Sequence, residues 1–410
     1  MEFKKYKLGE LASVDISGVD KKSKEGEKPV RLCNFTDVYK NWAITKYHYS
    51  SFMKATAKDR DIEKFSIHKG QVAITKDSET RDDIGIPTYI ADNFEDVVLG
   101  YHCALITPNE KLDGKYLNAY LNSKMAKKYF EGYASGSGQR YTLTLDSIND
   151  IQIWLPDITN QKKLAQVLSD IDQKIALNTR MNAELEAMAK QLYDYWFVQF
   201  DFPDENGNPY KSFGGEMVYN STLKREIPAG WEVKPLNDLL LLEDSRRIPL
   251  SNKERENRRG IYPYYGATGI MDYIDDYIFD GDYILLAEDG STSDKNGNPV
   301  VQYIWGKNWV NNHAHIIHAS DDSQLQFYYF LLKTIPVVLI ETGSIQKKIS
   351  QENLLAYSVA CPPKRLIGDY CSISSSFREK QKELTDENNY LTHIRDSLLP
   401  MLMNGQVIVE

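Results

Sequence analysis

Residues 164–196 read LAQVLSDIDQKIALNTRMNAELEAMAKQLYDYW and carry the strongest structural signal in this 410-residue chain. Charged residues separate apolar and amide side chains that recur in alternating steps of four and three. This spacing, kept over four heptads, predicts a long helix that packs on another helix along a narrow seam. Buried asparagines in such a seam commonly fix its register. The seam positions are Leu164, Leu168, Ile171, Ile175, Asn178, Asn182, Leu185, Ala189, Leu192 and Trp196.

A weaker copy of this pattern follows 206 residues later. Like the first, it comes after an apolar segment that ends in proline, at Pro156 and Pro362. We expect the two helices to pack on each other in antiparallel orientation; the alternative is a pair of long surface helices on separate domains. The second seam comprises Tyr370, Ser374, Phe377, Gln381, Leu384, Asn388, Leu391, Arg395, Leu398 and Leu402.

The rest of the chain is also duplicated. Gly70-Gln71-Val72-Ala73-Ile74 returns as Gly281-Asp282-Tyr283-Ile284-Leu285, and His102 returns as His313, both after 211 residues. A period near two hundred residues is far longer than the ~20–50 residues of a solenoid repeat. The sequence therefore predicts two copies of one domain, each followed by one helix. The offset changes from 211 to 206 between His102 and Pro156.

Within each copy, short apolar alternations and turn clusters predict a mixed domain. We expect strands around Gly70–Thr75, Leu99–Thr107, Tyr283–Ala287 and Ala314–Ile317, and helices at Lys115–Lys128 and Leu325–Leu332. The predicted fold class is α+β: two similar α/β domains separated by two long antiparallel coiled-coil helices in a pseudo-two-fold internal repeat. The predicted segments are a first domain at 1–157, a central helix at 158–200, a linker at 201–230, a second domain at 231–362 and a C-terminal helix at 363–405.

The net charge of −9 is unusual for a protein that binds nucleic acid on its own. The excess is local, because residues 1–157 carry 23 basic and 23 acidic side chains, whereas residues 201–362 carry 15 and 23. Seven acids and no lysine or arginine lie between Asp272 and Asp289, and we expect them to face solvent or a partner. This balance argues against tight, non-specific DNA binding by the isolated chain, but permits DNA binding inside a complex with positively charged subunits.

Cellular context is suggested only weakly. The four cysteines have no CxxC spacing, so we expect buried free thiols in a reducing cytoplasm. No apolar run approaches the ~18 residues of a membrane span, and the start lacks the apolar core of a signal peptide. We therefore expect a cytoplasmic protein with no membrane partner.

The segment between the two halves resembles a known family. Trp196-Phe197-Val198-Gln199-Phe200-Asp201-Phe202-Pro203, Gly214–Val218 and Ile227-Pro228-Ala229-Gly230-Trp231 resemble the central region of the specificity subunit of type I restriction–modification systems. Tyr262–Gly269 and Thr342–Ser350 resemble loops of that family's second recognition domain. The resemblance implies that each domain reads one half of a bipartite DNA target. It also implies that the helices set the spacer and that methyltransferase subunits bind along them.

Motifs for catalysis are missing from the sequence. A DNA methyltransferase needs a (D/N/S)PP(Y/F) motif, and the nearest match, Asn208-Pro209-Tyr210, lacks the second proline. There is also no GxxxxGK[ST] nucleotide-binding motif. His313-Ala314-His315 has the alternate spacing of metal ligands on a strand, but no third ligand is evident and the first copy has only His102. We therefore expect no catalytic residue and no metal site.

Candidate DNA-contacting residues in the first copy come from two loops. Ser135–Tyr141 combines glycines with an amide and a cation just before the last strand, and Lys76–Arg81 follows an expected strand. Glutamine can pair with adenine, arginine or lysine can pair with guanine, and cations and hydroxyls can bind phosphates; an ordinary polar turn is the alternative. The predicted contacts are Lys76, Arg81, Ser137, Gln139, Arg140 and Tyr141.

Equivalent loops in the second copy supply the remaining candidates. Gly343–Lys348 occupies the place of the Ser135–Tyr141 loop, and Ser291–Lys295 follows the strand near Gly281. A basic stretch and a tyrosine pair precede them, for which a solvated surface or packing is the alternative. The predicted contacts are Arg246, Arg247, Arg258, Arg259, Tyr264, Tyr265, Ser291, Thr292, Ser344, Gln346, Lys347 and Lys348.

These observations favour a non-catalytic subunit that recognises double-stranded DNA. The chain itself would need no cofactor; AdoMet would be bound by its methyltransferase partners, and ATP and Mg²⁺ by a restriction or translocase subunit where one is present. Two alternatives remain open from the sequence: a coiled-coil scaffold that binds only proteins, and a divergent methyltransferase or nuclease.

Overall fold

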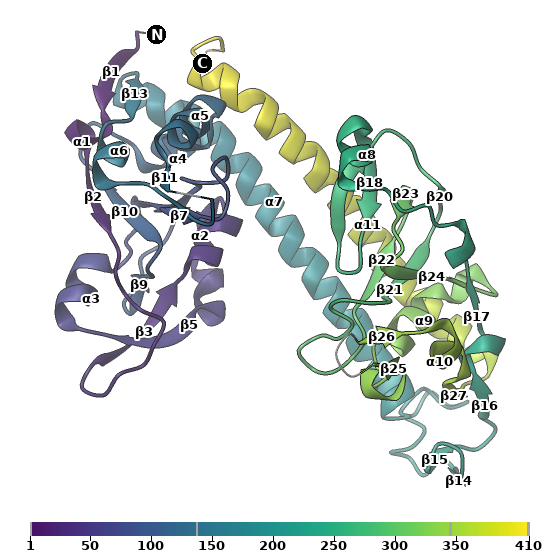
Figure 1. Cartoon of the computed structure of the whole chain (residues 1–410). Helices are drawn as coiled ribbons and strands as arrows, with labels where there is room; N and C mark the ends of the chain where they lie inside the picture. The colour runs from purple at the N-terminus through teal and green to yellow at the C-terminus, as the bar shows by residue number, and fades with distance from the viewer. Residues whose placement is uncertain (1, 137, 344–346, 408–410) are drawn as a thin grey trace. The chain divides into compact units, whose positions relative to one another are not determined.

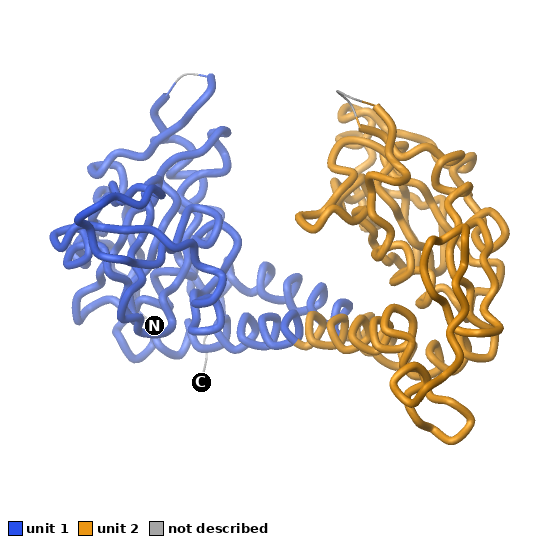
Figure 2. The backbone as a smooth tube through the Cα atoms, turned by 90° about the horizontal axis from the view of Figure 1, so that it is seen from below, with its two compact units in different colours: residues 1–180, 384–410 blue, residues 181–383 orange. Residues whose placement is uncertain are grey.

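The computed structural model describes residues 2–136, 138–343 and 347–407. The chain divides into two compact units (Figure 2): unit 1 comprises residues 1–180 and 384–410, and unit 2 comprises residues 181–383. The boundary falls within two long helices, α7 (Ile158–Tyr193) and α11 (Lys364–Met403), so each helix contributes to both units. The two helices begin 206 residues apart, as the repeat predicts.

In unit 1 the helices pack antiparallel through polar contacts between buried side chains. Asn178, which is completely buried, donates from Nδ2 to Glu387 at 2.8 Å, and Asn388 donates to the carbonyl oxygen of Ile175 at 3.3 Å. The Arg395 guanidinium lies 3.9 Å from the Asp172 carboxylate. Apolar residues of both predicted seams, among them Leu164, Leu168 and Leu402, lie in the core of this unit.

In unit 2 the same two helices again run antiparallel. Gln381 donates to the carbonyl oxygen of Asn182 at 2.9 Å, and the hydroxyl of Tyr370 donates to that of Ala189 at 3.2 Å. An aromatic core forms where α7 continues as a π-helical turn, Asp194–Val198, and packs on α9 (Leu325–Leu332). The predicted pairing of the two helices is confirmed within both units.

The core of unit 1 contains a five-stranded sheet in the order β2-β10-β6-β8-β4 (Figure 1). The bounds of its strands are Ala12–Ile16, Cys103–Pro108, Val72–Thr75, Pro87–Ile90 and Ala43–Ile44. A second sheet, β5-β3-β9, comprises Met53–Ala57, Lys28–Cys33 and Val97–Leu99. The helices α4 (Gly114–Asn122) and α5 (Lys124–Tyr133) replace the single helix expected at Lys115–Lys128, because Ser123 caps the start of α5.

Unit 2 repeats the centre of this arrangement. Its sheet β17-β24-β21-β22 comprises Leu240–Leu242, Ala314–Ala319, Tyr283–Ala287 and Val301–Ile304. A second sheet, β19-β18-β23-β20, comprises Ile270–Ile274, Arg259–Tyr265, Lys307–Val310 and Phe279–Asp280. Two short pairs close the domains at their ends: β1–β13 (Lys4–Lys7 and Gln152–Leu155) in unit 1 and β16–β27 (Glu232–Pro235 and Ser358–Cys361) in unit 2.

The strand register corrects one detail of the repeat. Cys103 pairs with Thr75 in unit 1, and Ala314 pairs with Ala287 in unit 2. The offset is therefore 211 on one strand and 212 on its neighbour, not 211 throughout. The correction matters because a one-residue shift exchanges the two faces of a strand.

Residues 201–230, expected as a linker, form an ordered segment. They include a hairpin of β14 (Met217–Asn220) and β15 (Arg225–Pro228), and Ile227 packs with Phe200 and Ala360 in a small core. The four cysteines are free, and three of them are buried. Among the described residues, no helix is both long and apolar enough to cross a membrane.

Candidate DNA interface

A polar hairpin lies at the same place in both domains. In unit 1, β11 (Ser135–Gly136) and β12 (Tyr141–Thr142) pair with each other, and β12 also pairs with β7 (Asp77–Ser78), which follows the central strand β6. In unit 2, β25 (Glu341–Thr342) and β26 (Lys348–Ile349) pair, and Lys348 forms a bridge with Asp289 just after β21. The expected equivalence of the two loops is therefore visible in the strand pairing.

The cations of the first hairpin differ in how free they are. The Lys76 ammonium is largely buried and binds Asp77 at 2.8 Å and the Thr142 hydroxyl at 2.9 Å, so it holds the hairpin to the sheet. Arg81 donates to the carbonyl oxygen of Ala134 at 3.0 Å, and its guanidinium lies 5.9 Å from the Tyr141 ring.

The tip of this hairpin is accessible. Gln139 and Arg140 are exposed, and Gln139 has no side-chain hydrogen bond within the described part of the chain. Ser137 lies outside the described residues. The tip therefore offers DNA an amide and a guanidinium, whereas Lys76 at its base is engaged in the fold.

Arg140 rests on an imidazole that is itself tied to a carboxylate. Its Nη2 lies 2.9 Å from Nε2 and 3.1 Å from Nδ1 of His102, and Nδ1 of His102 makes a short hydrogen bond with Asp77. Burial alone would raise the pKa of Asp77, but hydrogen bonds from Lys76, Thr142 and His102 lower that pKa to about 2. Asp77 is therefore a permanent anion beneath the hairpin.

In the second hairpin both described cations are paired with acids. The Lys347 ammonium lies 2.6 Å from Glu341, and the Lys348 ammonium lies 2.8 Å from Glu288. Both lysine side chains are about half exposed. Ser344 and Gln346 lie outside the described residues. In these contacts DNA phosphates would compete with carboxylates for the two lysines.

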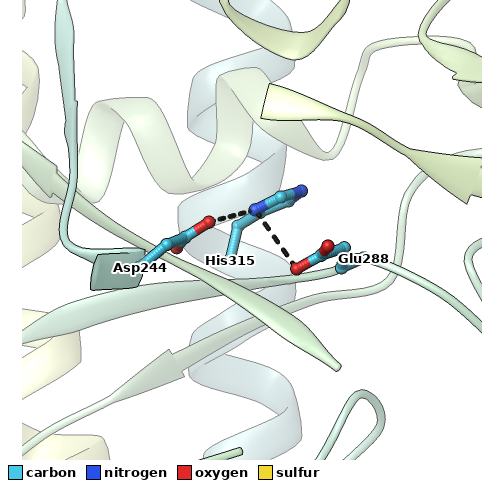
Figure 3. A group of neighbouring side chains, drawn as sticks. All are labelled: Asp244, Glu288 and His315. Carbon is cyan, nitrogen blue, oxygen red and sulfur yellow. Dashed lines mark hydrogen bonds and ion pairs between the residues drawn. The ribbon is translucent and has the colours of Figure 1, made fainter. Parts of the chain in front are cut away.

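A buried charged cluster anchors this hairpin to the sheet (Figure 3). His315, only 1% exposed, places Nδ1 2.5 Å from Asp244 and 3.7 Å from Glu288, and Nε2 2.8 Å from the carbonyl oxygen of Ile349. Burial alone would lower the pKa of His315, but these hydrogen bonds and the two carboxylates raise it. Since carboxylate and carbonyl oxygens both accept, each ring nitrogen donates and the ring is an imidazolium.

The ligand atoms of Asp244, Glu288 and His315 lie within 4.8 Å of one another, which is a spacing that could hold a metal ion. The chemistry of the cluster argues against this use. An imidazolium has no lone pair for a metal, and Arg247 lies 2.7 Å from Glu288 and 3.3 Å from Asp244. The cluster is an internal ion network. The other histidine of the expected pair, His313, binds Asp289 instead, at 2.7 Å.

The basic stretch of the second domain is also engaged internally. Arg246 pairs with Glu243 and lies 4.7 Å from the Phe279 ring, while Arg258 binds Asp275 at 2.9 Å. Arg247 is mostly buried and donates to the carbonyl oxygen of Ala314 at 2.8 Å as well as to its two carboxylates. Of these four arginines, only Arg259 is exposed with no side-chain partner in the described part of the structure.

Three further candidates of the second domain differ in accessibility. Tyr264 is 1% exposed, and its hydroxyl accepts a hydrogen bond from the Leu250 amide; Thr292 is 2% exposed. The expectation that these two side chains contact DNA is wrong for this conformation, because packing occupies both. Tyr265 is half-buried, and burial raises its pKa to about 12. Ser291 is exposed on the loop after β21.

Comparison with known proteins places these two domains. Residues 1–187 and 228–391 match the family model described as the type I restriction modification DNA specificity domain. The chain belongs to this family. It is a DNA specificity subunit of the type I restriction–modification class, as the resemblance implied.

Two relatives of the specificity family align over most of their length. The type I restriction enzyme MjaIX specificity subunit of Methanocaldococcus jannaschii is 28% identical over 74% of this chain and 72% of its own length. The type I restriction enzyme HindI specificity subunit of Haemophilus influenzae is 24% identical over 84% and 88%. The crystal structure of a type I restriction–modification S subunit from M. genitalium has the same fold, with a TM-score of 0.54 and 15% identity over 98% of this chain and 96% of that one.

Sequence reasoning about this specificity subunit located the hairpins but missed what lies under them. Asp77 and Asp289 each bind the histidine that the repeat had singled out, and neither was a candidate. They are 212 residues apart, whereas the histidines are 211 apart, so a single offset does not align both. A search allowing one inserted residue would have found the pairs.

Proposed function

We propose that each domain of this specificity subunit binds one half of a bipartite DNA target through its polar hairpin. The observation that carries the proposal is the repeated position of the hairpin, which joins the sheet at the same point in both domains, whereas its side chains differ. A shared scaffold with different tips suits two readers of different sequences. The tips carry amide, guanidinium and ammonium groups, which are the side chains that pair with base edges and phosphates.

We further propose that the chain performs no catalysis and directs partner subunits. Methyltransferase subunits would bind along α7 and α11 and flip an adenine from each half-site, since a base inside the stack is inaccessible to chemistry. AdoMet would belong to those subunits, and ATP with Mg²⁺ to a restriction or translocase subunit. The 36-residue helix α7 is about 54 Å long at 1.5 Å per residue. We propose that this length helps to set the spacer between the half-sites.

A domain exchange tests the two-reader proposal. The chain is co-expressed with its modification subunit, and methylated adenines are mapped genome-wide to define the motif. Replacing residues 231–362 with the corresponding domain of another specificity subunit should change one half of the motif and leave the other half and the methylated strand pattern intact. A change in both halves, or in neither, would contradict the proposal.

The spacer proposal has a separate test. Deleting or inserting one heptad within residues 164–196, with the matching change in α11, should change the number of unspecified base pairs between the half-sites. The half-site sequences should stay the same. An unchanged spacer with intact methylation would refute the role of helix length.

A further inference from the structure

The two domains share a buried link that lies beneath each hairpin. In unit 1, the amide of Lys76 donates to the carbonyl oxygen of His102 at 2.7 Å, and the next residue, Asp77, binds the His102 ring. In unit 2, the amide of Glu288 donates to the carbonyl oxygen of His313 at 2.9 Å, and the next residue, Asp289, binds that ring. The same backbone contact and the same aspartate–histidine pair therefore occur twice.

Each aspartate also contacts the hairpin strand at equivalent positions. Asp77 pairs with Thr142 in β12, and Asp289 pairs with Lys348 at the start of β26. Thr142 and Lys348 are 206 residues apart, the same separation as the strands and helices that follow them. The pair thus connects the central sheet to the hairpin in both domains.

The backbone at His102 is unusual. Its φ is +72°, which places a non-glycine residue in the left-handed region. Such a conformation costs of order 1–3 kcal/mol and persists only where the surroundings determine it, often at functional positions. Here the conformation brings the ring against Asp77 on one side and Arg140 on the other.

We propose that Asp77 and His102 are positioning residues that hold Arg140 of the specificity subunit for contact with DNA, and that Asp289 and His313 support the second hairpin in the same way. The inference rests on the proposed function, because it assigns residues to the hairpin that reads the first half-site. Arg140 is the group that reaches the DNA, whose acceptor is a phosphate oxygen or the guanine edge. His102 provides the surface on which the guanidinium rests.

This arrangement explains why the pair is duplicated although the tips differ. A residue present in both copies cannot by itself distinguish two half-sites. A shared support for different tips can serve both. In unit 2, the residue 206 positions after Arg140 is Gln346, which lies outside the described residues, so the proposal for His313 concerns the support alone.

The experiment uses the full chain in complex with its modification subunit. The probe is a plasmid library carrying the mapped motif with each half-site randomised in turn. The variants are Arg140→Ala, His102→Asn and their double mutant. Asparagine tolerates the left-handed region, so the backbone at position 102 keeps its conformation while the imidazole is lost. The mirrored control is His313→Asn.

Arg140→Ala should lower methylation roughly 5- to 150-fold through the first half-site, as expected for one lost guanidinium contact. If the acceptor is a guanine, selectivity at one position of that half-site relaxes; if it is a phosphate, methylation falls uniformly over sequences. His102→Asn should reproduce most of the loss, and the double mutant should be no worse than Arg140→Ala alone. His313→Asn should affect only the second half-site.

A pH profile separates positioning from a merely structural role. The ring of His102 faces Asp77 of β7, Arg140 of the β11–β12 loop, and the neighbouring Lys76 and Tyr101. Protonating the ring places a second positive charge against the guanidinium. First half-site binding should therefore weaken as the imidazole is protonated, and this dependence should vanish in His102→Asn while the thermal midpoint changes little.

The outcomes distinguish this inference from the function on which it rests. A wild-type complex that methylates no bipartite motif would refute the proposed function and the inference together. A clear wild-type motif that is unaffected by Arg140→Ala or His102→Asn would refute the inference alone. Additive losses in the double mutant, or tighter binding on protonation, would also refute it, because His102 would then contact DNA independently.

Discussion

Replacing His315 with alanine should loosen the second hairpin without disturbing unit 1. The imidazolium links three parts of unit 2: Asp244 after β17, its own strand β24, and the carbonyl oxygen of Ile349 in β26. Alanine is acceptable at this point in the fold, since the equivalent residue of β10, two strands from the edge in unit 1, is Ala104. The change therefore tests the ion network rather than the packing of the sheet.

The magnitude follows from the lost contacts. A hydrogen bond between charged groups contributes about 1.5–3 kcal/mol, and one to a neutral carbonyl about 1 kcal/mol. Removing His315 also leaves Asp244 with less positive charge around it, although Arg247, Gln351 and the Ile316 amide still contact it. We expect a loss of about 3 kcal/mol in the local stability of the β24–β26 region. That loss corresponds to roughly 100-fold faster amide exchange.

The loss should depend on pH in a defined direction. The pKa of His315 is raised in the folded protein above the ordinary value of 6.5, so the folded chain retains this proton to higher pH than the unfolded chain. The stabilisation is complete below that ordinary value and declines as the pH rises through the raised folded value. The difference between wild type and His315→Ala should therefore be larger at pH 6 than at pH 9.

Hydrogen exchange followed by mass spectrometry over residues 340–360 measures this effect directly. The matched control is His313→Ala, because the His313 side chain is 49% exposed and such pairs contribute about 0–1 kcal/mol. Equal exchange in the two variants at pH 6 would refute the reasoning. A difference between wild type and His315→Ala that stays constant from pH 6 to pH 9 would show that His315 is not charged in the fold.

Three other substitutions test the helix pair and the sheet. Burial raises the pKa of Asp172 to about 6 despite nearby Arg395, so its stabilisation falls as pH rises from about 4 to 6, and Asp172→Asn should raise stability by roughly 1–3 kcal/mol at pH 8 in denaturant titrations; a lower midpoint would contradict this. Glu186→Gln leaves two buried cations without a carboxylate and should cost roughly 3–5 kcal/mol, seen as a lower thermal midpoint. Gly114→Ala would place a Cβ 2.0 Å from the carbonyl oxygen of Gly70, so it should reduce soluble yield or the thermal midpoint markedly, whereas Gly132→Ala, with open space around it, should not.

The helices were the most predictable part of the fold because their signal is local. A seam with a period of 3.5 residues identifies both the helix and the face that packs, and the asparagines predicted in the seam do bond across it, as Asn178 and Asn388 show. The repeat offset was less certain by one residue between β6 and β21. Apolar alternation locates a strand but does not count an extra residue before it.

Candidate DNA contacts were harder to predict because exposure depends on distant residues. Arg247 is at a position rich in cations, yet it is held by Glu288 and Asp244, and Glu288 lies 41 residues away in the sequence. Tyr264 lies beside Tyr265 on one strand, but only Tyr264 is fully buried. Neither outcome follows from the local sequence, since each depends on which strand lies opposite.

The acidic run of the second domain shows how charge counts can mislead. Of its seven acids, six lie within ion-pair distance of a basic group in unit 2, and we had expected the run to face solvent or a partner. Arg258 alone lies near two of them, and Lys382 of α11 lies 2.7 Å from Asp282. The six are Asp272, Asp275, Asp276, Asp282, Glu288 and Asp289.

Internal pairing changes how the two domains should bind DNA. In the second domain, Arg246, Arg258, Lys347 and Lys348 must exchange a carboxylate for a phosphate, so their net gain on binding is small. In the first domain, Arg140 rests on an imidazole and exchanges no carboxylate. Each phosphate contact made by a free cation lowers log K by about 0.9 per decade of salt. The salt dependence of binding should therefore come mainly from the first half-site, even though both domains recognise sequence.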